Sequence, residues 1–280
     1  EPLISKELTP GRVIAELDGS FPGTTEWILS NGVKVVLKQT NFKDDEIIMN
    51  ATSRGGKSLY SAEDASTLKV FPYLHEAGGL GNFSSTNLRK ALAGKKANAG
   101  LNIGAYSETV YGNCAVKDLE TMLQLVYLTF TDIRKDQEVY DVNKGQYQSV
   151  YANNASNPKF ICSDSLRNTM YAGNPMLSIM KAEDFTAANY DRMLEIAKER
   201  TANAADYTFN FVGSFDPEVL RPLVEKYIAT LPASAQREEM KASTIYAKGQ
   251  NINHFSLPME NPASSVYVIY SGTTKHNLRK

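Results

Sequence analysis

The feature that most constrains the fold is the order of patterns within residues 88–130. This stretch reads L-R-K-A-L-A-G-K-K-A-N-A-G-L-N-I-G-A-Y-S-E-T-V-Y-G-N-C-A-V-K-D-L-E-T-M-L-Q-L-V-Y-L-T-F. Gly94 ends a helical pattern, and residues 98–106 and 108–115 are two strand-like runs. Asp118 can cap a further helix, whose apolar residues recur at three- and four-residue steps, as on one helix face. The stretch therefore predicts a helix end, two strands and a second helix, in that order.

The apolar stripe of this second helix predicts different burial for two of its leucines. Leu123 falls within the apolar stripe, whereas Leu125 falls outside it. We therefore expect Leu125→Ala to lower the stability less than Leu123→Ala. Leu128, which lies opposite the stripe, leaves open the alternative that the helix is buried all round.

Turn and capping signals divide the rest of the chain. Ser30-Asn31-Gly32 separates two apolar runs and predicts a hairpin, because a type I′ turn needs positive φ at both central residues. Asp216 and Pro217 can begin a helix. Strands are predicted at residues 26–29, 33–37, 46–53, 207–212, 252–257 and 264–270, and helices at 64–76, 86–93, 137–153, 160–171, 184–200 and 217–231.

These patterns indicate an α+β organisation in four segments. Residues 1–24 are expected to be an extended linker, and residues 25–232 one complete module. Residues 233–250 are polar and predict a second linker, and residues 251–280 predict the opening hairpin of a following, truncated module. The order of strand pair and helices thus suggests a weak internal repeat. A plain extension of the first sheet is the alternative.

Composition excludes some partners. The formal net charge of −1 gives no reason to expect nucleic-acid binding. No apolar run approaches the roughly 20 residues of a membrane-spanning helix. The first residues lack a signal-peptide pattern and an initiator Met, so we expect a mature chain or an excised piece. Cys114 and Cys162 are expected to be buried free thiols, with a disulfide as the alternative.

Two apparent motifs have simpler interpretations. Residues 54–58 read R-G-G-K-S, but a phosphate-binding loop would need glycine at position 51, which is Ala51. We expect a strand-to-helix turn there. His75-Glu76 has no second histidine three or four residues away, so we expect His75 to lie at a helix end, where it suits the helix dipole.

Four segments together resemble the pitrilysin/insulinase family of zinc peptidases. They are S-N-G-V-K-V-V-L, G-K-K-A-N-A, S-E-T-V-Y and F-V-G-S-F-D-P-E-V-L-R-P-L-V-E-K-Y-I-A-T-L-P, and the resemblance covers about residues 20–270. It implies an α+β, metallohydrolase-like module with an antiparallel or mixed sheet and helices packed on one face. The family encloses a chamber between two halves, one of which carries an inverted zinc motif, H-x-x-E-H.

The chain departs from that motif. The two histidines would fall near residues 67–71, which read T-L-K-V-F, and the helix of the third ligand reads N-K-G-Q-Y-Q at residues 143–148. Amides are poor substitutes for the donors that zinc needs. The resemblance therefore implies the non-catalytic half, with no catalytic residue, metal ligand or cofactor in this chain and with zinc in the catalytic half of the parent. The family also binds the substrate backbone through an Arg and a Tyr in an R-x6-Y arrangement. The resemblance implies that this pair belongs to a later module, beyond Lys280, so no residue of this chain is expected to take its role.

The expected function is to enclose and position extended peptides for the zinc-bearing half, which makes that half and the peptide the expected partners. Residues 98–107 correspond to the family's substrate-side edge strand, so Asn98, Leu101, Ile103 and Ala105 are candidate peptide contacts. Sheet packing is the alternative for these four. A structural or binding subunit without proteolytic role is the alternative function, and a self-sufficient hydrolase is disfavoured by the missing ligands. The resemblance also suggests a bacterial cell-envelope or periplasmic location.

Overall fold

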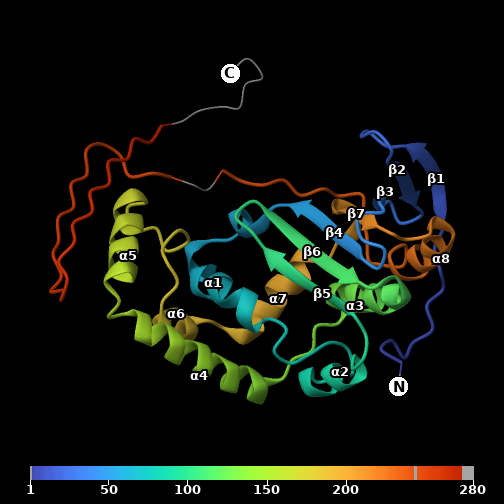
Figure 1. Ribbon diagram of the computed structural model, residues 1–280, viewed down its shortest axis with the longest axis horizontal. Coiled ribbons are helices and arrows are strands. Elements are labelled where there is room, and N and C mark those ends of the chain that lie inside the picture. The colour runs from blue at the N-terminus through green and yellow to red at the C-terminus, as the bar shows by residue number, and fades with distance from the viewer. Residues whose placement is uncertain (1, 243–244, 273–280) are drawn as a thin grey trace.

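The computed structural model describes residues 2–242 and 245–272, and it confirms the predicted α+β fold with a mixed sheet and helices (Figure 1). The seven strands are β1 (Val13–Asp18), β2 (Thr25–Leu29), β3 (Lys34–Gln39), β4 (Ile47–Arg54), β5 (Ala97–Ile103), β6 (Ser107–Cys114) and β7 (Thr208–Gly213). The α-helices are α1 (Ala65–Leu74), α2 (Ser85–Ala91), α3 (Leu119–Thr131), α4 (Gln137–Asn154), α5 (Pro158–Met170), α6 (Ala182–Ala187), α7 (Tyr190–Arg200) and α8 (Pro217–Tyr227). Short 3-10 turns are η1 (Gly56–Leu59), η2 (Ala62–Asp64), η3 (Val116–Asp118) and η4 (Ala204–Asp206).

The sheet has the strand order β1-β2-β3-β7-β4-β6-β5. Strand β7 is parallel to β3 and antiparallel to β4, with Phe211 opposite Leu37 on one side and Met49 on the other. Phe209 and Phe211 of β7 are fully buried. The last strand of the sheet therefore joins the β1-β2-β3 meander to the β4-β6-β5 group.

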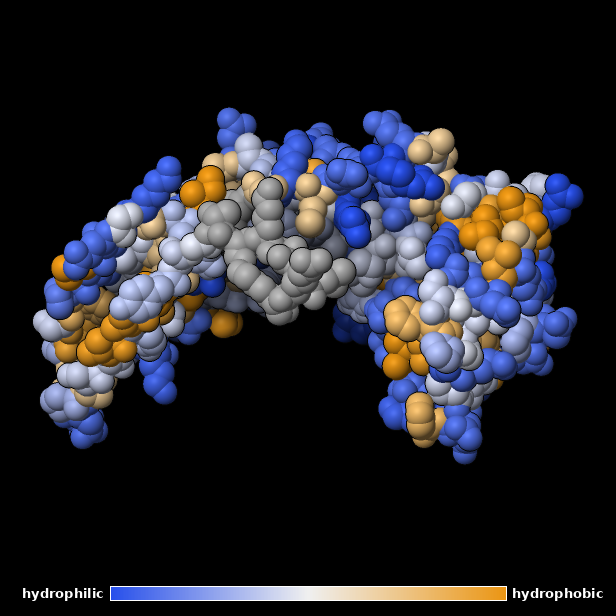
Figure 2. All heavy atoms as spheres, turned by 90° about the horizontal axis from the view of Figure 1, so that it is seen from above, coloured by the Kyte–Doolittle hydropathy of each residue, from blue (hydrophilic) through white to orange (hydrophobic). Residues whose placement is uncertain are grey.

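One face of the sheet is covered and the other is open. Alternate residues of β4 are buried, whereas Ile48, Asn50 and Thr52 face outward. Helix α3 packs on β5 and β6, and α1 also contacts β5. This alternation is the period-two pattern of a sheet with one core face. In space-filling view the molecule is an arch with apolar surface gathered at both ends (Figure 2).

The N-terminal segment is more ordered than the expected linker. β1 pairs with β2, for example Glu16 with Trp27, and forms one edge of the sheet. The backbone N–H of Val13 also donates to Glu225 of α8, at 2.9 Å. Ile14 and Leu17 remain exposed on this edge strand, which is why the pattern of residues 13–18 did not predict a strand.

The predicted hairpin is confirmed, but its expected turn type is wrong. Gly32 has a positive φ of 84°, whereas Asn31 does not adopt the left-handed region. The Asn31 side chain instead donates to the carbonyls of Ile228 and Leu231 at 2.9 and 3.2 Å. A tertiary contact thus determines the conformation of the first turn residue.

Two helix predictions also need correction. The single helix predicted at residues 184–200 is two helices, because Asn189 lies extended between α6 and α7 and caps α7 by accepting from the N–H of Arg192. The Asp118 side chain does not cap α3. Its carboxylate accepts from the N–H of Lys96 at 2.8 Å, which ties the entry of α3 to the start of β5.

The two strands predicted at residues 252–257 and 264–270 do not form in the described part of the chain. The chain there runs extended beside α5, where Asn253 donates to Ser165 and Thr169 at 2.6 and 2.9 Å. Val266 and Tyr270 are almost fully exposed, because no neighbouring strand pairs with this segment. Residues 273–280 of the predicted hairpin lie outside the described residues. Neither Cys114 nor Cys162 is in a disulfide, and only Cys114 is fully buried.

Helix α3 is buried nearly all round, which makes the expected contrast between its two leucines wrong. Leu123 is 0% exposed and Leu125 is only 3% exposed. One side of α3 packs on β5 and β6, and another packs on α8. The apolar stripe predicted from the sequence was therefore only part of the buried surface.

A buried ion pair links the sheet to α7. Arg200 Nη1 lies 3.6 Å from Glu108 Oε1, and both side chains are at most 5% exposed. Glu108 also accepts from the N–H of Gly56 at 2.7 Å, and Arg200 binds Glu238 at 2.7 Å and donates to the Tyr60 hydroxyl at 2.8 Å. Burial raises the pKa of Glu108, opposed by the Gly56 hydrogen bond and the charge of Arg200. The network joins β6, η1, α7 and the segment after α8.

We expect Leu123→Ala and Leu125→Ala to destabilise the chain by similar amounts, about 2–5 kcal/mol each, because both remove a buried leucine. Urea unfolding monitored by circular dichroism measures both losses. The exposed Val142→Ala on α4 is the control and should change stability by less than about 0.5 kcal/mol. A Leu125 variant as stable as this control would contradict the structure.

We expect Arg200→Met to cost about 3–5 kcal/mol, because it leaves the Glu108 carboxylate buried without its cation. Adding Glu108→Gln should restore part of this loss. Since desolvation raises the pKa of Glu108 above 4.5, the folded single variant binds a proton more tightly than the unfolded chain. The stability of Arg200→Met should therefore rise as the pH falls from neutral towards the folded-state pKa of Glu108, relative to the double variant.

Urea melts over this pH range test the coupling. Lys43→Met is the control, because it removes an exposed ion pair with Glu46, worth less than about 1 kcal/mol. Equal losses for Arg200→Met and Lys43→Met would show that the buried network contributes little.

Candidate functional site

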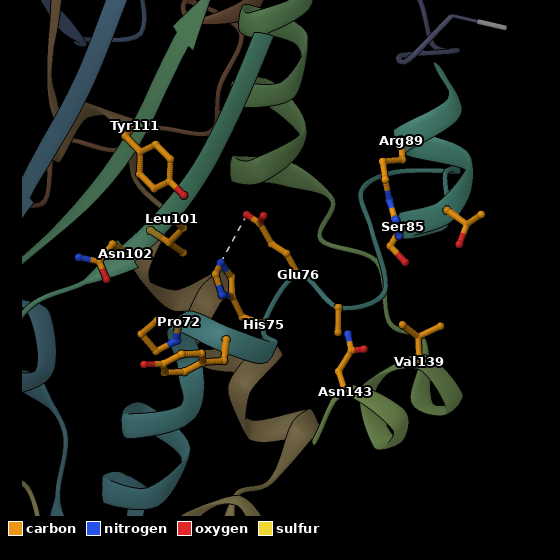
Figure 3. A pocket seen from close by; sticks show the side chains of 13 residues that line it. Pro72, His75, Glu76, Ser85, Arg89, Leu101, Asn102, Tyr111, Val139 and Asn143 are labelled. Carbon is orange, nitrogen blue, oxygen red and sulfur yellow. Dashed lines mark ion pairs between the residues drawn. The ribbon is translucent and has the colours of Figure 1, made fainter. Parts of the chain in front are cut away.

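The candidate site is a pocket of about 520 Å³ beside the free edge of the sheet (Figure 3). Its walls come from the end of α1, from α2, from the start of α4 and from β5 and β6. The chemically informative side chains are His75, Glu76, Arg89, Asn102, Tyr111 and Asn143. These residues come from separate elements, so the pocket depends on the packing of α1 against β5 and of α4 against α1.

His75 lies at the C-terminal end of α1, as predicted. Its ring stacks on Phe71, with ring centres 4.2 Å apart and planes at 9°. Its Nδ1 lies 2.7 Å from the Phe71 carbonyl oxygen. Because a carbonyl only accepts, Nδ1 carries the hydrogen of this contact. The helix end therefore uses the hydrogen on Nδ1 of this histidine.

Glu76 extends from the same helix end toward Leu101 and Tyr111 (Figure 3). Its Oε1 lies 3.4 Å from His75 Nε2. Both atoms are buried, and neither has a hydrogen-bond partner among the described residues. The Glu76 side chain as a whole is 28% exposed. One carboxylate oxygen therefore faces the histidine, and the group as a whole still reaches solvent.

The other walls supply polar groups of different kinds. Arg89 extends from α2, whose N-terminus is capped by Ser84. Tyr111 of β6 lies across from Gly100 of β5, and its ring occupies the space that a side chain at Gly100 would take. Partial burial raises the pKa of Tyr111, and the negative charge of Glu76 raises it further. The pocket thus contains a carboxylate whose charge acts on the opposite wall.

The four predicted peptide contacts lie in or just after the edge strand. Asn98, Leu101 and Ile103 are in β5, and Ala105 is in the turn before β6. The side chains of Leu101 and Ile103 are buried in the core, Asn98 accepts from the N–H of Asn113, and the Ala105 carbonyl accepts from Ser58. Of these four residues, Leu101 borders the pocket.

Residues at the expected zinc-ligand positions have structural contacts. Thr67 is buried and accepts from the N–H of Asn189 at 3.1 Å, and Phe71 is fully buried. Asn143 borders the pocket, whereas Gln146 is exposed. Among residues 2–242 and 245–272, no three His, Cys, Asp or Glu side chains form a group that could hold a metal. None of the helices in the described ranges is long and apolar enough to cross a bilayer.

Sequence reasoning missed the pocket because its members come from separate elements. His75-Glu76 was visible only as a histidine at a helix end, and Arg89, Asn102 and Asn143 carried no motif. The adjacent His and Glu, next to a glycine-rich turn, were the one local signal. Their partners across the pocket depend on tertiary packing.

The comparisons with known proteins agree with this fold. No protein-family model matches the chain. A zinc protease PQQL-like protein of Arabidopsis thaliana is 25% identical over 238 residues, which are 84% of this chain and 22% of that protein. The chain therefore spans less than a quarter of the length of this curated relative.

Solved structures show the same domain fold. The periplasmic protease PqqL from Escherichia coli matches with a TM-score of 0.71 and 16% identity, over 86% of this chain and 26% of that one. The ferredoxin protease FusC, solved as a mutant in complex with Arabidopsis ferredoxin, matches with a TM-score of 0.68 and 18% identity, over 88% and 27%. A protease from Helicobacter pylori matches with a TM-score of 0.63 and 12% identity, over 81% and 55%. In sequence and in fold, the chain is therefore similar to a domain of pitrilysin/PqqL-like zinc proteases and covers about a quarter of the larger of these proteins.

Proposed function

We propose that the chain is part of the non-catalytic half of a zinc metalloendopeptidase and that it positions extended peptides for a zinc-bearing half. The observation that carries this proposal is that α1 has packing side chains at the positions expected for zinc ligands. Where the resemblance places the zinc histidines, the helix has Thr67 bound to the N–H of Asn189 and Phe71 in the core. At these positions, the side chains of α1 therefore stabilise the fold.

The pocket does not fit the family's zinc. A catalytic zinc takes three protein ligands of His, Cys, Asp or Glu type and an open position. At this pocket His75 Nε2 and Glu76 Oε1 are two such donors, and Asn143 and Asn102 offer amides. We therefore propose that hydrolysis is carried out by a different part of the parent protease.

The peptide-binding part of the proposal is supported by the position of β5. This strand is last in the sheet order, so its outer main-chain groups are not paired with another strand in the described ranges. A free edge can accept an extended peptide as an added strand. Because Leu101 and Ile103 point into the core, we propose that they contact peptide through their main chain, together with Asn98. We propose that Ala105, in the turn between β5 and β6, contacts the end of the bound peptide.

The relatives support the proposal for the whole protein. They are about four times as long as the matched region, and their names describe proteases. We propose that residues 25–232 form the complete module, with residues 1–24 and 233–250 as its connections and residues 251–280 as the opening of the next module. The catalytic half, in the same or a partner chain, is the proposed partner. A periplasmic location is proposed from the PqqL likeness.

We expect the purified chain to bind no stoichiometric zinc, because its pocket lacks a third donor of the required type. Elemental analysis of protein prepared without chelator, after removal of any affinity tag, measures the zinc content. The expected value is far below one zinc per chain. A ratio close to one would overturn the non-catalytic assignment.

We expect the chain alone to leave peptides uncleaved, and we expect cleavage once the intact parent or its other half is present. A quenched-fluorescence peptide assay compares the chain, the other half, their mixture and the parent, each with and without a chelator. Chelator-sensitive cleavage by this chain alone would contradict the proposal. Absence of cleavage by the intact parent would favour a structural or binding subunit.

A further inference from the structure

The Glu76 carboxylate is a partly buried charge at the pocket with an unpartnered oxygen. Its Oε1 has one polar neighbour, His75 Nε2 at 3.4 Å, and neither atom has a hydrogen-bond partner among the described residues. The hydrogen on His75 Nδ1 is used by the Phe71 carbonyl, so Nδ1 has no hydrogen left for Glu76. A partly buried carboxylate without donors is costly, and a ligand with N–H groups would relieve that cost.

Within residues 2–242 and 245–272, the Glu76 carboxylate has no permanent cation as a partner. No lysine or arginine forms an ion pair with Glu76 in the part of the chain that the structure describes. Arg89 extends from α2 on the far wall of the pocket, on the other side from His75 and Glu76 (Figure 3). The two walls therefore carry opposite charges, and the space between them is open to a ligand.

The position of Glu76 relative to β5 selects the type of ligand. Glu76 points toward Leu101 of the free edge strand and toward Tyr111 on β6 (Figure 3). Its charge acts on Tyr111, which shows that the carboxylate and the strand pair share one electrostatic environment. A peptide added along β5 would pass directly in front of this carboxylate.

We propose that Glu76, next to His75, is a specificity-determining subsite for a primary ammonium group on a peptide that lies along β5. The inference rests on the proposed peptide-binding function and adds a preference to it. The ammonium donates to the Glu76 carboxylate, and Asn102 and Asn143 line the same pocket. Either the α-amino terminus or a lysine side chain of the peptide supplies this chemistry.

The test uses three hexapeptides rich in Val and Thr, labelled at the C-terminus and titrated with the 280-residue chain by fluorescence anisotropy. One has a free α-amine and no lysine, one has an acetylated terminus and a single lysine, and one has an acetylated terminus and acetyl-lysine. We expect one amine-bearing peptide, or both, to bind about fivefold more tightly than the doubly acetylated peptide, less so at high salt. The peptide that gains affinity identifies the source of the ammonium.

Variants assign the preference to the carboxylate. Glu76→Gln should abolish it, and the matched Glu63→Gln, an exposed glutamate outside the pocket, should retain it. Amide shifts of Asn102 and Tyr111 in the unmodified chain, measured by NMR with the amine-bearing peptide, give a second readout that needs no variant. We expect these shifts to exceed those of the peptide without an amine.

The outcomes separate this inference from the proposed function. Equal affinity for all three peptides, or a preference that survives Glu76→Gln, would overturn the ammonium subsite and leave peptide binding intact. Binding of none of the peptides would overturn both. Loss of the preference in Glu76→Gln alone, with NMR shifts at the pocket, supports the subsite.

Discussion

The structure depends on the insertion of β7 between β3 and β4. Strand β7, residues 208–213, pairs in parallel with β3 and antiparallel with β4. It therefore lies in the middle of a sheet whose other strands all come from the part of the chain before residue 115. Phe209 and Phe211 bury their side chains there and place the core under the whole sheet. Every helix between β6 and β7 must fold back for this strand to reach its place. The positions of α4, α6 and α7 around α1 follow from that requirement.

The connection from β6 back to β7 also places a buried ion pair, Arg200 with Glu108, beside the sheet. Helix α7 leads into β7, and its last residue, Arg200, lies against Glu108 of β6 and Tyr60 after η1. Burial of two charges is costly unless both are well bonded, and here the N–H of Gly56 and the carboxylate of Glu238 complete the bonding. Such a network favours one arrangement of the connection over its alternatives. It also ties the segment after α8 back to the sheet.

The pocket lies where separate elements within residues 72–143 meet. Helix α1 ends beside the free edge of β5, and α4 begins opposite it, so His75-Glu76 and Asn143 meet across a space that neither helix defines alone. In the proposed role, the family scaffold has exchanged a metal-binding helix for one that packs on the core. The edge strand remains available for an extended peptide. The carboxylate beside that edge would then add a chemical preference to main-chain recognition that is otherwise independent of sequence.

The sequence by itself determined the local elements and the family. The spacing of apolar residues located α3, the Asn31-Gly32 signal located the first hairpin, and Asp216-Pro217 located the start of α8, because each of these depends on neighbours within a few residues. Family motifs in residues 88–130 added the fold class, since their order is shared by a whole module.

Only the tertiary structure decided the features that depend on distant partners. Leu125 is buried because β5, β6 and α8 pack around α3 and leave little of it exposed, and Asn31 leaves the type I′ geometry because its side chain binds carbonyls near the end of α8. β1 is a strand because β2 is available to pair with it, and residues 264–270 remain unpaired because no strand lies beside them. The pocket belongs to the same class, since His75, Arg89 and Asn143 become neighbours only when α1, α2 and α4 assemble at the edge of the sheet.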